Sequence, residues 1–132
     1  MSAKRKGTAA ERELLHMLCD AGFSCVRVAG SGSIAEPSCD LLAGNGLLKM
    51  AIECKTCMAK KKYLDKNQIN EFKKFAEKFG LISFLAVRFA RNGWWFISPE
   101  KLESTGKGLA ISLEEIQKDG KSFEGLIKNG VA

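Results

Sequence analysis

An acid and a base stand two positions apart in residues 50–55, a run of strand-forming residues that carries Glu53 and Lys55. Alternate residues of a strand point to the same face, roughly 6–7 Å apart, so these two side chains would share a face while Cys54 points to the other. Asp40 lies ahead of another apolar stretch. Two carboxylates and a lysine on neighbouring strands can hold Mg²⁺ and orient a water molecule. The pattern predicts metal-assisted hydrolysis of phosphodiesters.

Each of these residues also has a purely structural interpretation. Asp is depleted within strands and common in turns, so Asp40 could simply end a loop. A buried Glu53 needs a partner, and Lys55 could be that partner in an ordinary ion pair. The occurrence of all three residues on adjacent predicted strands favours the metal site.

A third carboxylate, Glu11, lies on a predicted helix and shares a face with Leu15 and Leu18, since residues four and seven positions apart lie on one side of a helix. Such a carboxylate lies at the edge of the core or reaches a site. Thr8 and Glu11 also have the spacing of a capping box, which would explain Glu11 without a function. Both interpretations stay open at this point.

The composition is that of a packed globular protein, because 45% of the 132 residues are hydrophobic and 27% are charged. This length fits a single domain over residues 1–132 with a flexible basic N-terminal tail over about residues 1–6. No apolar run approaches the ~20 residues of a membrane span, and no secretory signal pattern is visible. We therefore expect a cytoplasmic protein without a membrane partner.

The net charge of +6 and the sequence pI of about 9.1 favour a polyanionic partner such as DNA. Two basic clusters are candidates for phosphate contacts, although each could be a solvated charge run: Lys4, Arg5 and Lys6, and Lys60, Lys61 and Lys62. Further candidates are Arg12, Arg27, Ser31 and Ser33. Either arginine could equally be a surface charge, and serine in such a loop is usually a turn residue.

The five cysteines do not suggest a disulfide framework, because their number is odd and no secretion signal is visible. Cys54 and Cys57 match half of a zinc site or a redox pair. Zinc would need two more ligands, and the only histidine, His16, lies inside a predicted helix. Buried thiols acting as small apolar residues are the better interpretation.

The hydrophobic pattern predicts two main helices, over residues 8–21 and 65–78, each ended by a glycine. Strands are expected over residues 23–29, 40–43, 47–56, 81–89 and 94–97, with a tight hairpin at Asn45 and Gly46. The first three strands should form an antiparallel meander, and the third and fourth, joined through a helix, could be parallel. Residues 60–63 are expected to form a basic loop. Weaker signals predict an edge strand over 109–112 and short helices over 113–118 and 123–128.

This order, α-β-β-β-α-β-β, predicts an α/β or α+β sandwich in which helices cover a central mixed sheet, and we expect the α/β class. Aromatic residues of the second helix and the last strand are most often core residues. Trp94 and Trp95 are consecutive on a strand, so one faces each side of the sheet, and an uncovered apolar face would mark an interface. Self-association through these elements is a hypothesis, and its candidate residues are Phe72, Phe75, Phe79, Trp94 and Trp95.

Taken together, the sequence resembles a known group of nucleases. Glu11 on an early helix, Asp40, and Glu53-x-Lys55 match the pattern of the PD-(D/E)xK superfamily. The flanking segments resemble the archaeal Holliday junction resolvases: residues 5–14 (RKGTAAEREL), 26–31 (VRVAGS), 40–46 (DLLAGNG), 52–55 (IECK) and 93–97 (GWWFI). The resemblance covers roughly residues 5–97, and residues 100–132 add little to it.

The resemblance implies a restriction-endonuclease-like fold, with a central mixed five-stranded sheet flanked by helices. It implies a homodimer that binds four-way DNA junctions by shape and nicks two opposing strands, using Mg²⁺ or Mn²⁺. By position, Asp40 and Glu53 would ligate the metal with the main-chain carbonyl of Cys54. Lys55 would position or activate the attacking water, and Glu11 would bind or orient a second metal ion or its water.

The resemblance also implies that Arg12, Arg27 and Ser31 hold the phosphates of the scissile region. The helix that bears Phe75 and Phe79 would form the dimer surface. The segment 31–40 looks longer than the usual family loop, so Ser33 is an alternative to Ser31. Two other functions stay open: another nuclease of this superfamily, acting in DNA repair or restriction, and a non-catalytic nucleic-acid-binding module.

Overall fold

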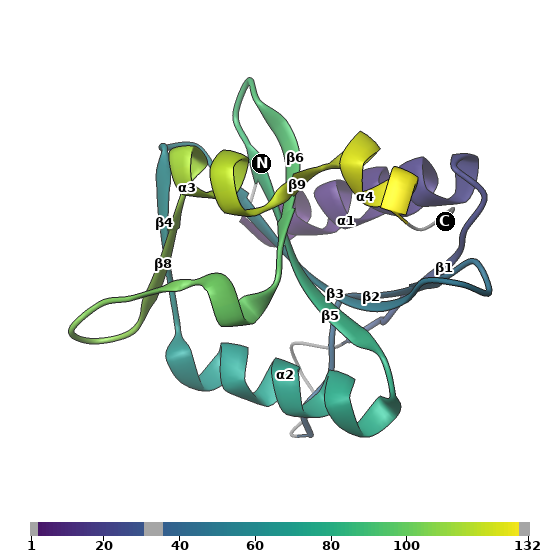
Figure 1. The fold of residues 1–132 in the computed structure, drawn as a ribbon, viewed down its shortest axis with the longest axis horizontal. Helices are drawn as coiled ribbons and strands as arrows, with labels where there is room; N and C mark the ends of the chain where they lie inside the picture. The colour runs from purple at the N-terminus through teal and green to yellow at the C-terminus, as the bar shows by residue number, and fades with distance from the viewer. Residues whose placement is uncertain (1–2, 31–35, 130–132) are drawn as a thin grey trace.

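The main sheet has six strands in the order β1-β2-β3-β5-β6-β9 in the computed structural model, which describes residues 3–30 and 36–129 (Figure 1). Its strands are β1 (Ser24–Arg27), β2 (Leu41–Gly44), β3 (Lys49–Cys57), β5 (Ile82–Phe89), β6 (Gly93–Ile97) and β9 (Lys121–Ser122). The expected central mixed sheet is present. The expectation of five strands is wrong, because the two-residue strand β9 pairs with β6 and extends the edge.

The strand directions follow the predicted connections. β1, β2 and β3 form an antiparallel meander, β3 and β5 are parallel, and β5 and β6 are antiparallel. The parallel pair is joined through a crossover that contains α2 (Lys66–Phe79), as a strand-helix-strand connection requires. This arrangement places the first turn of α2 after the carboxyl end of β3.

Helices cover both faces of the sheet (Figure 1). α1 (Ala3–Asp20) and α4 (Phe123–Asn129) pack on one face, where Met50 and Ile52 of β3 join their core. α2 packs on the other face, where Ala51 meets Phe72. Successive residues of β3 therefore alternate between the two layers, as the pleat of a strand requires.

Turn and cap residues act as predicted at the hairpin and at α2. The side chain of Asn45 accepts hydrogen bonds from the backbone N–H groups of Leu47 and Leu48 at 2.9 and 2.7 Å, and Gly46 has a φ of 92°. Gly80 ends α2 with a φ of 81°, in the left-handed region that glycine adopts most easily. Local chemistry therefore explains these boundaries.

Two expectations for the N-terminus are wrong. α1 begins at Ala3, so residues 3–6 are helical and not a tail outside the helix. Thr8 consequently lies inside the helix and cannot be its N-cap, which removes the capping box as the explanation of Glu11. The rest of the N-terminal prediction is confirmed, because a helix ends near Gly22 and a strand follows it.

The expected basic loop at residues 60–63 is also wrong, because β4 (Lys61–Leu64) is a strand of a second, three-stranded sheet. β8 (Leu109–Ser112) is the central strand of that sheet, between β4 and β7 (Glu103–Ser104), and not an edge. η1 (Pro99–Lys101) follows β6, and α3 (Leu113–Asp119) follows β8. The long separation of β4 and β8 in the chain hides this pairing from local patterns.

Two of the five aromatic residues expected at a dimer surface are buried within the chain. Phe72 lies on the inner face of α2 and is 2% exposed, and Trp94 faces the α1 side of the sheet and is 5% exposed, so both assignments to a dimer surface are wrong. Phe75 and Trp95 are half-buried, and Phe79 is 61% exposed.

Across the parts of the chain that the structure describes, no helix combines the length and apolarity that crossing a membrane requires.

Candidate active site

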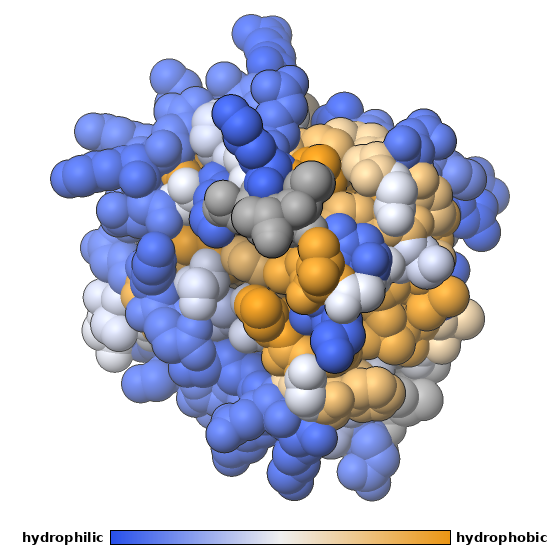
Figure 2. All heavy atoms as spheres, turned by 45° about the vertical axis from the view of Figure 1, so that its right-hand side comes forward, coloured by the Kyte–Doolittle hydropathy of each residue, from blue (hydrophilic) through white to orange (hydrophobic). Residues whose placement is uncertain are grey.

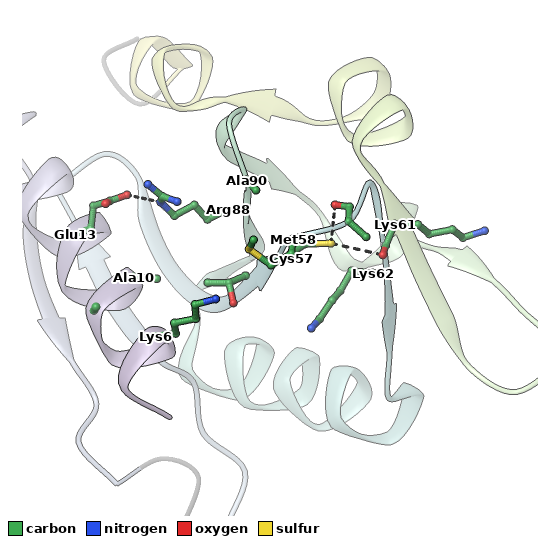
Figure 3. Close-up of a pocket in the computed structure, with 12 residues that line it drawn as sticks. Lys6, Ala10, Glu13, Cys57, Met58, Lys61, Lys62, Arg88 and Ala90 are labelled. Carbon is green, nitrogen blue, oxygen red and sulfur yellow. Dashed lines mark hydrogen bonds and ion pairs between the residues drawn. The ribbon is translucent and has the colours of Figure 1, made fainter. Parts of the chain in front are cut away.

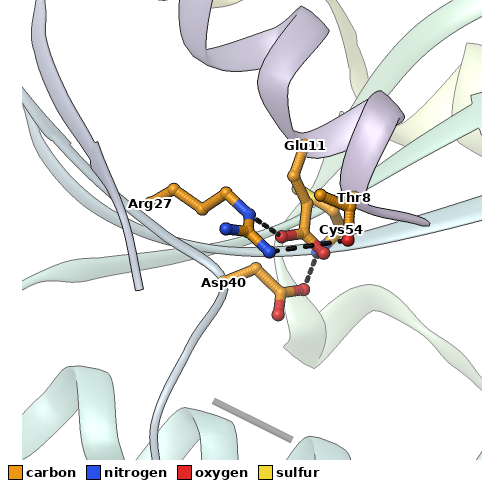
Figure 4. Close-up of polar contacts among 5 residues, drawn as sticks. All are labelled: Thr8, Glu11, Arg27, Asp40 and Cys54. Carbon is orange, nitrogen blue, oxygen red and sulfur yellow. Dashed lines mark hydrogen bonds and ion pairs between the residues drawn. The ribbon is translucent and has the colours of Figure 1, made fainter. Parts of the chain in front are cut away.

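Asp40 is held where β1, β2 and β3 meet. Its backbone N–H donates to the carbonyl of Ile52 at 3.1 Å, and its own carbonyl accepts from the N–H of Val28 at 2.8 Å. Its carboxylate Oδ2 accepts a hydrogen bond from the backbone N–H of Cys54 at 2.8 Å (Figure 4). Backbone and side chain therefore both fix this carboxylate against the middle of β3.

Glu53 and Lys55 share the α2 face of β3, and Cys54 packs with the core on the α1 side. Glu53 is 8% exposed, and among the described residues it is the charged side chain that lies buried in the core. The ammonium of Lys55 donates to the side-chain carbonyl of Gln68 on α2 at 3.1 Å. The alternation expected from the strand pattern is thus observed.

The carboxyls of Asp40 and Glu53 belong to one electrostatic cluster, because the charge of Asp40 acts on Glu53. The pKa of Glu53 is raised to about 8, mainly by burial and also by the negative charge of Asp40, while Lys55 opposes the rise. Two acids in a poorly solvated place cannot both carry a negative charge without compensation. A proton, or a cation bound between them, supplies that compensation.

Glu11 reaches the same region from α1. Nε of Arg27, at the end of β1, donates to Oε1 of Glu11 at 2.9 Å, and Nη2 donates to the hydroxyl of Thr8 at 3.5 Å (Figure 4). Burial and the charge of Asp40 raise the pKa of Glu11, whereas Arg27 lowers it. Glu11 therefore belongs to the electrostatic cluster of Asp40 and Glu53, and Arg27 orients it.

This cluster can accept a hard divalent cation with few protein ligands. Within residues 3–30 and 36–129, no three acid, histidine or cysteine side chains converge as a ready-made metal cage. Mg²⁺ does not need such a cage, since it keeps several waters and is commonly held by one or two carboxylates. The pair of Asp40 and Glu53 fits that requirement.

The predicted phosphate contacts lie mainly on α1 and around the start of β4. Arg5 and Lys6 are exposed on α1, which also contains Lys4 and the exposed Arg12. Lys60 and Lys61 are exposed, Lys62 is half-buried, and the ammonium of Lys61 lies 5.4 Å from the ring centre of Tyr63. Ser31 and Ser33 lie outside the described residues.

One neighbour of the site, Gln68, is not among the residues that the sequence predicts to lie there. The backbone N–H of Gln68 does donate to the Asp65 carboxylate at 3.2 Å, but its side chain accepts from Lys55. The signal that could have found it is the crossover itself, because a helix that follows a parallel strand begins near that strand's carboxyl end.

The zinc and redox interpretations find no support in the geometry. Cys54 and Cys57 stand three positions apart on β3, so they point to opposite faces, and all five cysteines are free thiols. The thiol of Cys57 donates to the carbonyl of Ala59 at 3.1 Å. Cys39 and Cys57 are buried as expected, whereas Cys19 is exposed.

A mixed sheet that brings Asp40, Glu53-x-Lys55 and a helix-borne Glu11 together defines a nuclease of the PD-(D/E)xK class. The chain belongs to the archaeal Holliday junction resolvase family, whose model, described as "Archaeal holliday junction resolvase (hjc)", matches residues 2–131.

Individual relatives agree with this assignment. The crossover junction endodeoxyribonuclease Hjc of Archaeoglobus fulgidus is 38% identical, over 92% of this chain and 94% of that protein. The protein of the same name from Methanocaldococcus jannaschii is 37% identical, over 96% of this chain and 90% of its own length. The solved structure of Archaeoglobus fulgidus Hjc, a Holliday junction resolvase, has a TM-score of 0.85 at 34% identity, covering 92% of this chain and 99% of that one.

Proposed function

We propose that this protein is a structure-specific endonuclease that resolves four-way DNA junctions by hydrolysing phosphodiesters in two opposing strands. Its family and its similarity to crossover junction endodeoxyribonucleases support this activity. The observation that carries the proposal is the meeting of Asp40, Glu53 and Lys55, with Glu11 added from α1.

We assign the divalent cation to Mg²⁺, for which Mn²⁺ can substitute. Asp40, Glu53 and the main-chain carbonyl of Cys54 would hold it, and Glu11 would orient a second ion or its water. When bound, the ion lowers the pKa of a water and neutralises charge that develops on the phosphate. Lys55 would orient the attacking water on the face that it shares with Glu53.

The basic residues around the site would bind the DNA backbone. Phosphate contacts supply affinity without sequence information, which suits an enzyme that selects its substrate by shape. The proposed contacts are Lys4, Arg5, Lys6, Arg12, Arg27, Lys60, Lys61 and Lys62, together with Ser31 or Ser33. Because its substrate is DNA within the cell, we also propose that the protein acts in the cytoplasm, as one nuclease domain.

We propose that two copies associate through an exposed apolar patch that contains Val26 and Phe79, which are 57% and 61% exposed. A hollow between β1, β2 and the end of α2 continues this patch and is lined by Cys25, Val26, Leu42, Phe79 and Leu81, among others. Figure 2 shows apolar side chains gathered on this side of the molecule. Two sites related by a two-fold axis match a substrate with two equivalent strands.

The activity is tested by incubating the protein with a mobile four-way junction, a flap and a linear duplex, with Mg²⁺ and with EDTA. We expect metal-dependent, symmetric cuts in two opposing strands of the junction. A preference for the linear duplex would instead favour a repair or restriction nuclease. Binding of the junction without any cutting in Mg²⁺ or Mn²⁺ would favour the non-catalytic module.

The site is tested by Asp40→Asn and Glu53→Gln, which remove a negative charge with little change of shape. Both variants should bind the junction like the wild type in a gel-shift titration and should not cut it. A variant that cuts at the normal rate would show that the active site lies elsewhere.

A further inference from the structure

A second concave site adjoins the proposed active site. It lies between the first turns of α1 and the turn that joins β3 to β4, beside the end of β5 (Figure 3). We call it the α1–β4 cleft, and it encloses about 540 Å³. Thr56, which lines it, directly follows Lys55 in β3. Because successive residues of a strand alternate faces, Thr56 faces the α1 side of β3, on the opposite side of the strand from Lys55.

The lining of the cleft combines small apolar side chains with basic ones. The apolar lining consists of Ala9, Ala10, Cys57, Met58, Ala59 and Ala90. The basic lining consists of Lys6, Lys61, Lys62 and Arg88. Met58 is 79% exposed, so its side chain is available to a ligand and does not fill the core.

The single acid of the lining, Glu13, neutralises Arg88 and leaves a positive excess from Lys6, Lys61 and Lys62. Oε1 of Glu13 accepts from Nε of Arg88 at 2.7 Å and from the indole N–H of Trp94 at 2.7 Å. These bonds tie α1 to β5 and β6 and lower the pKa of Glu13. The bond to Glu13 also fixes the guanidinium of Arg88 at the edge of the cleft.

Size and chemistry together restrict the ligand. A cavity of this volume is that of a small-molecule site, so it can enclose a nucleotide but not a double helix. Apolar surface beside lysine and arginine suits a single strand, whose base packs on the surface while its phosphates meet the cations. At the branch point of a junction a nucleotide can leave the base stack at a lower free-energy cost than in a continuous duplex, where a base pair must first open.

We propose that the α1–β4 cleft receives one unpaired nucleotide from the branch point of the junction. The base lies against the apolar lining, and the neighbouring phosphates contact Lys6, Lys62 and Arg88. This inference rests on the proposed function, and it adds a reason why a branched substrate is preferred over a linear one.

The cleft is tested by placing a negative charge in it from either side, with Ala9→Glu on α1 and Ala59→Glu on the turn. Both alanines are exposed, so neither change enters the core. His16→Glu, also exposed on α1 but outside the cleft lining, adds a comparable charge as the matched control. In Ca²⁺ at pH 8, fluorescence anisotropy should show junction affinity weakened about tenfold or more by each alanine variant. The control should stay within about twofold of the wild type.

The nucleotide is tested with a junction that carries 2-aminopurine beside the branch point, since its emission rises when the base unstacks. Saturating wild-type protein should raise the emission, and saturating Ala9→Glu should not. Alanine variants that bind like His16→Glu, or wild-type binding without increased emission, would overturn the proposal. If either outcome occurs while the wild type still cuts the junction symmetrically, the nucleotide-binding role of the cleft is refuted and the proposed function is not. A wild type that neither binds nor cuts the junction refutes the proposed function as well.

Discussion

At the scale of single residues, the candidate site is a place where two acids are held together at a cost to the folded protein. Asp40 is fixed by three hydrogen bonds to neighbouring strands, and Glu53 is buried beside it. Nothing in the packing of a core requires this pairing, because an apolar residue at position 53 would avoid the cost of burying a carboxylate. A cation that both carboxylates bind is the physical reason to keep them together.

The raised pKa of Glu53 predicts how stability depends on pH without metal. An acid whose pKa rises on folding, here from 4.5 to about 8, binds its proton more tightly in the folded state. Its contribution is therefore fully present below about pH 4.5 and is lost as the pH rises through about 8. In EDTA, the Tm of the wild type should fall between pH 5 and pH 8 more than that of Glu53→Gln.

Metal should reverse this loss, because a cation bound to the ionised pair stabilises the folded state. At pH 8, Mn²⁺ should raise the Tm of the wild type and leave that of Glu53→Gln nearly unchanged. Parallel pH profiles of the two proteins in EDTA would contradict the assigned cause of the shift.

Gln68 should affect cleavage through Lys55, because its side-chain oxygen accepts a hydrogen bond from the Lys55 ammonium at 3.1 Å. Gln68→Ala should slow single-turnover cutting by about tenfold, the lower range for loss of a group that orients a site residue. In a Lys55→Ala background, itself strongly impaired, the same change should have no further effect. Asn70→Ala, exposed on the same helix, is the control. Additive effects of the two substitutions would show that Gln68 does not work through Lys55.

At the scale of elements, α1 serves two sites from two sides. Glu11 faces Arg27 and the acids of the sheet, whereas Ala10 and Glu13 face the α1–β4 cleft. The start of the helix at Ala3 makes this possible, because it adds turns ahead of Glu11 that carry Lys6 to the cleft. The helix thus links the proposed chemistry to the proposed nucleotide site.

The N-terminus of α2 should be sensitive to its cap. The Asp65 carboxylate accepts from the N–H groups of Asn67 and Gln68 at 2.8 and 3.2 Å and thereby holds the turn that presents Gln68 to Lys55. Asp65→Ala should lower the free energy of unfolding by about 1 kcal/mol in urea titrations. It should also slow cutting, but less than Gln68→Ala does. Unchanged stability would mean that water replaces the cap.

At the scale of the whole molecule, apolar side chains of β1 and of the end of α2 are exposed to solvent. Phe79→Asp places a charge in the exposed apolar patch and should convert a dimer to a monomer in light scattering coupled to gel filtration. Leu47→Asp changes a residue that is 70% exposed in the β2–β3 hairpin, outside that patch, and should leave the dimer intact. A Phe79→Asp variant that remains dimeric would place the interface elsewhere.

Local chemistry determined the parts of this protein that depend on neighbours in the chain. The strand period was enough to put Glu53 and Lys55 on one face, and the turn residues were enough to place the β2–β3 hairpin and the end of α2. The meander and the parallel crossover followed from the lengths of the connections. The resemblance of short segments was sufficient to identify the family.

Only the tertiary structure decided which distant residues meet. The pairing of Glu11 with Arg27, the contact of Lys55 with Gln68, and the small sheet formed by β4 and β8 join residues far apart in sequence. The burial of Phe72 and Trp94 likewise depends on which faces the helices cover. The reason is physical: periodicity and capping act within a few residues, whereas burial and long-range hydrogen bonds are set by the packing of whole elements against one another.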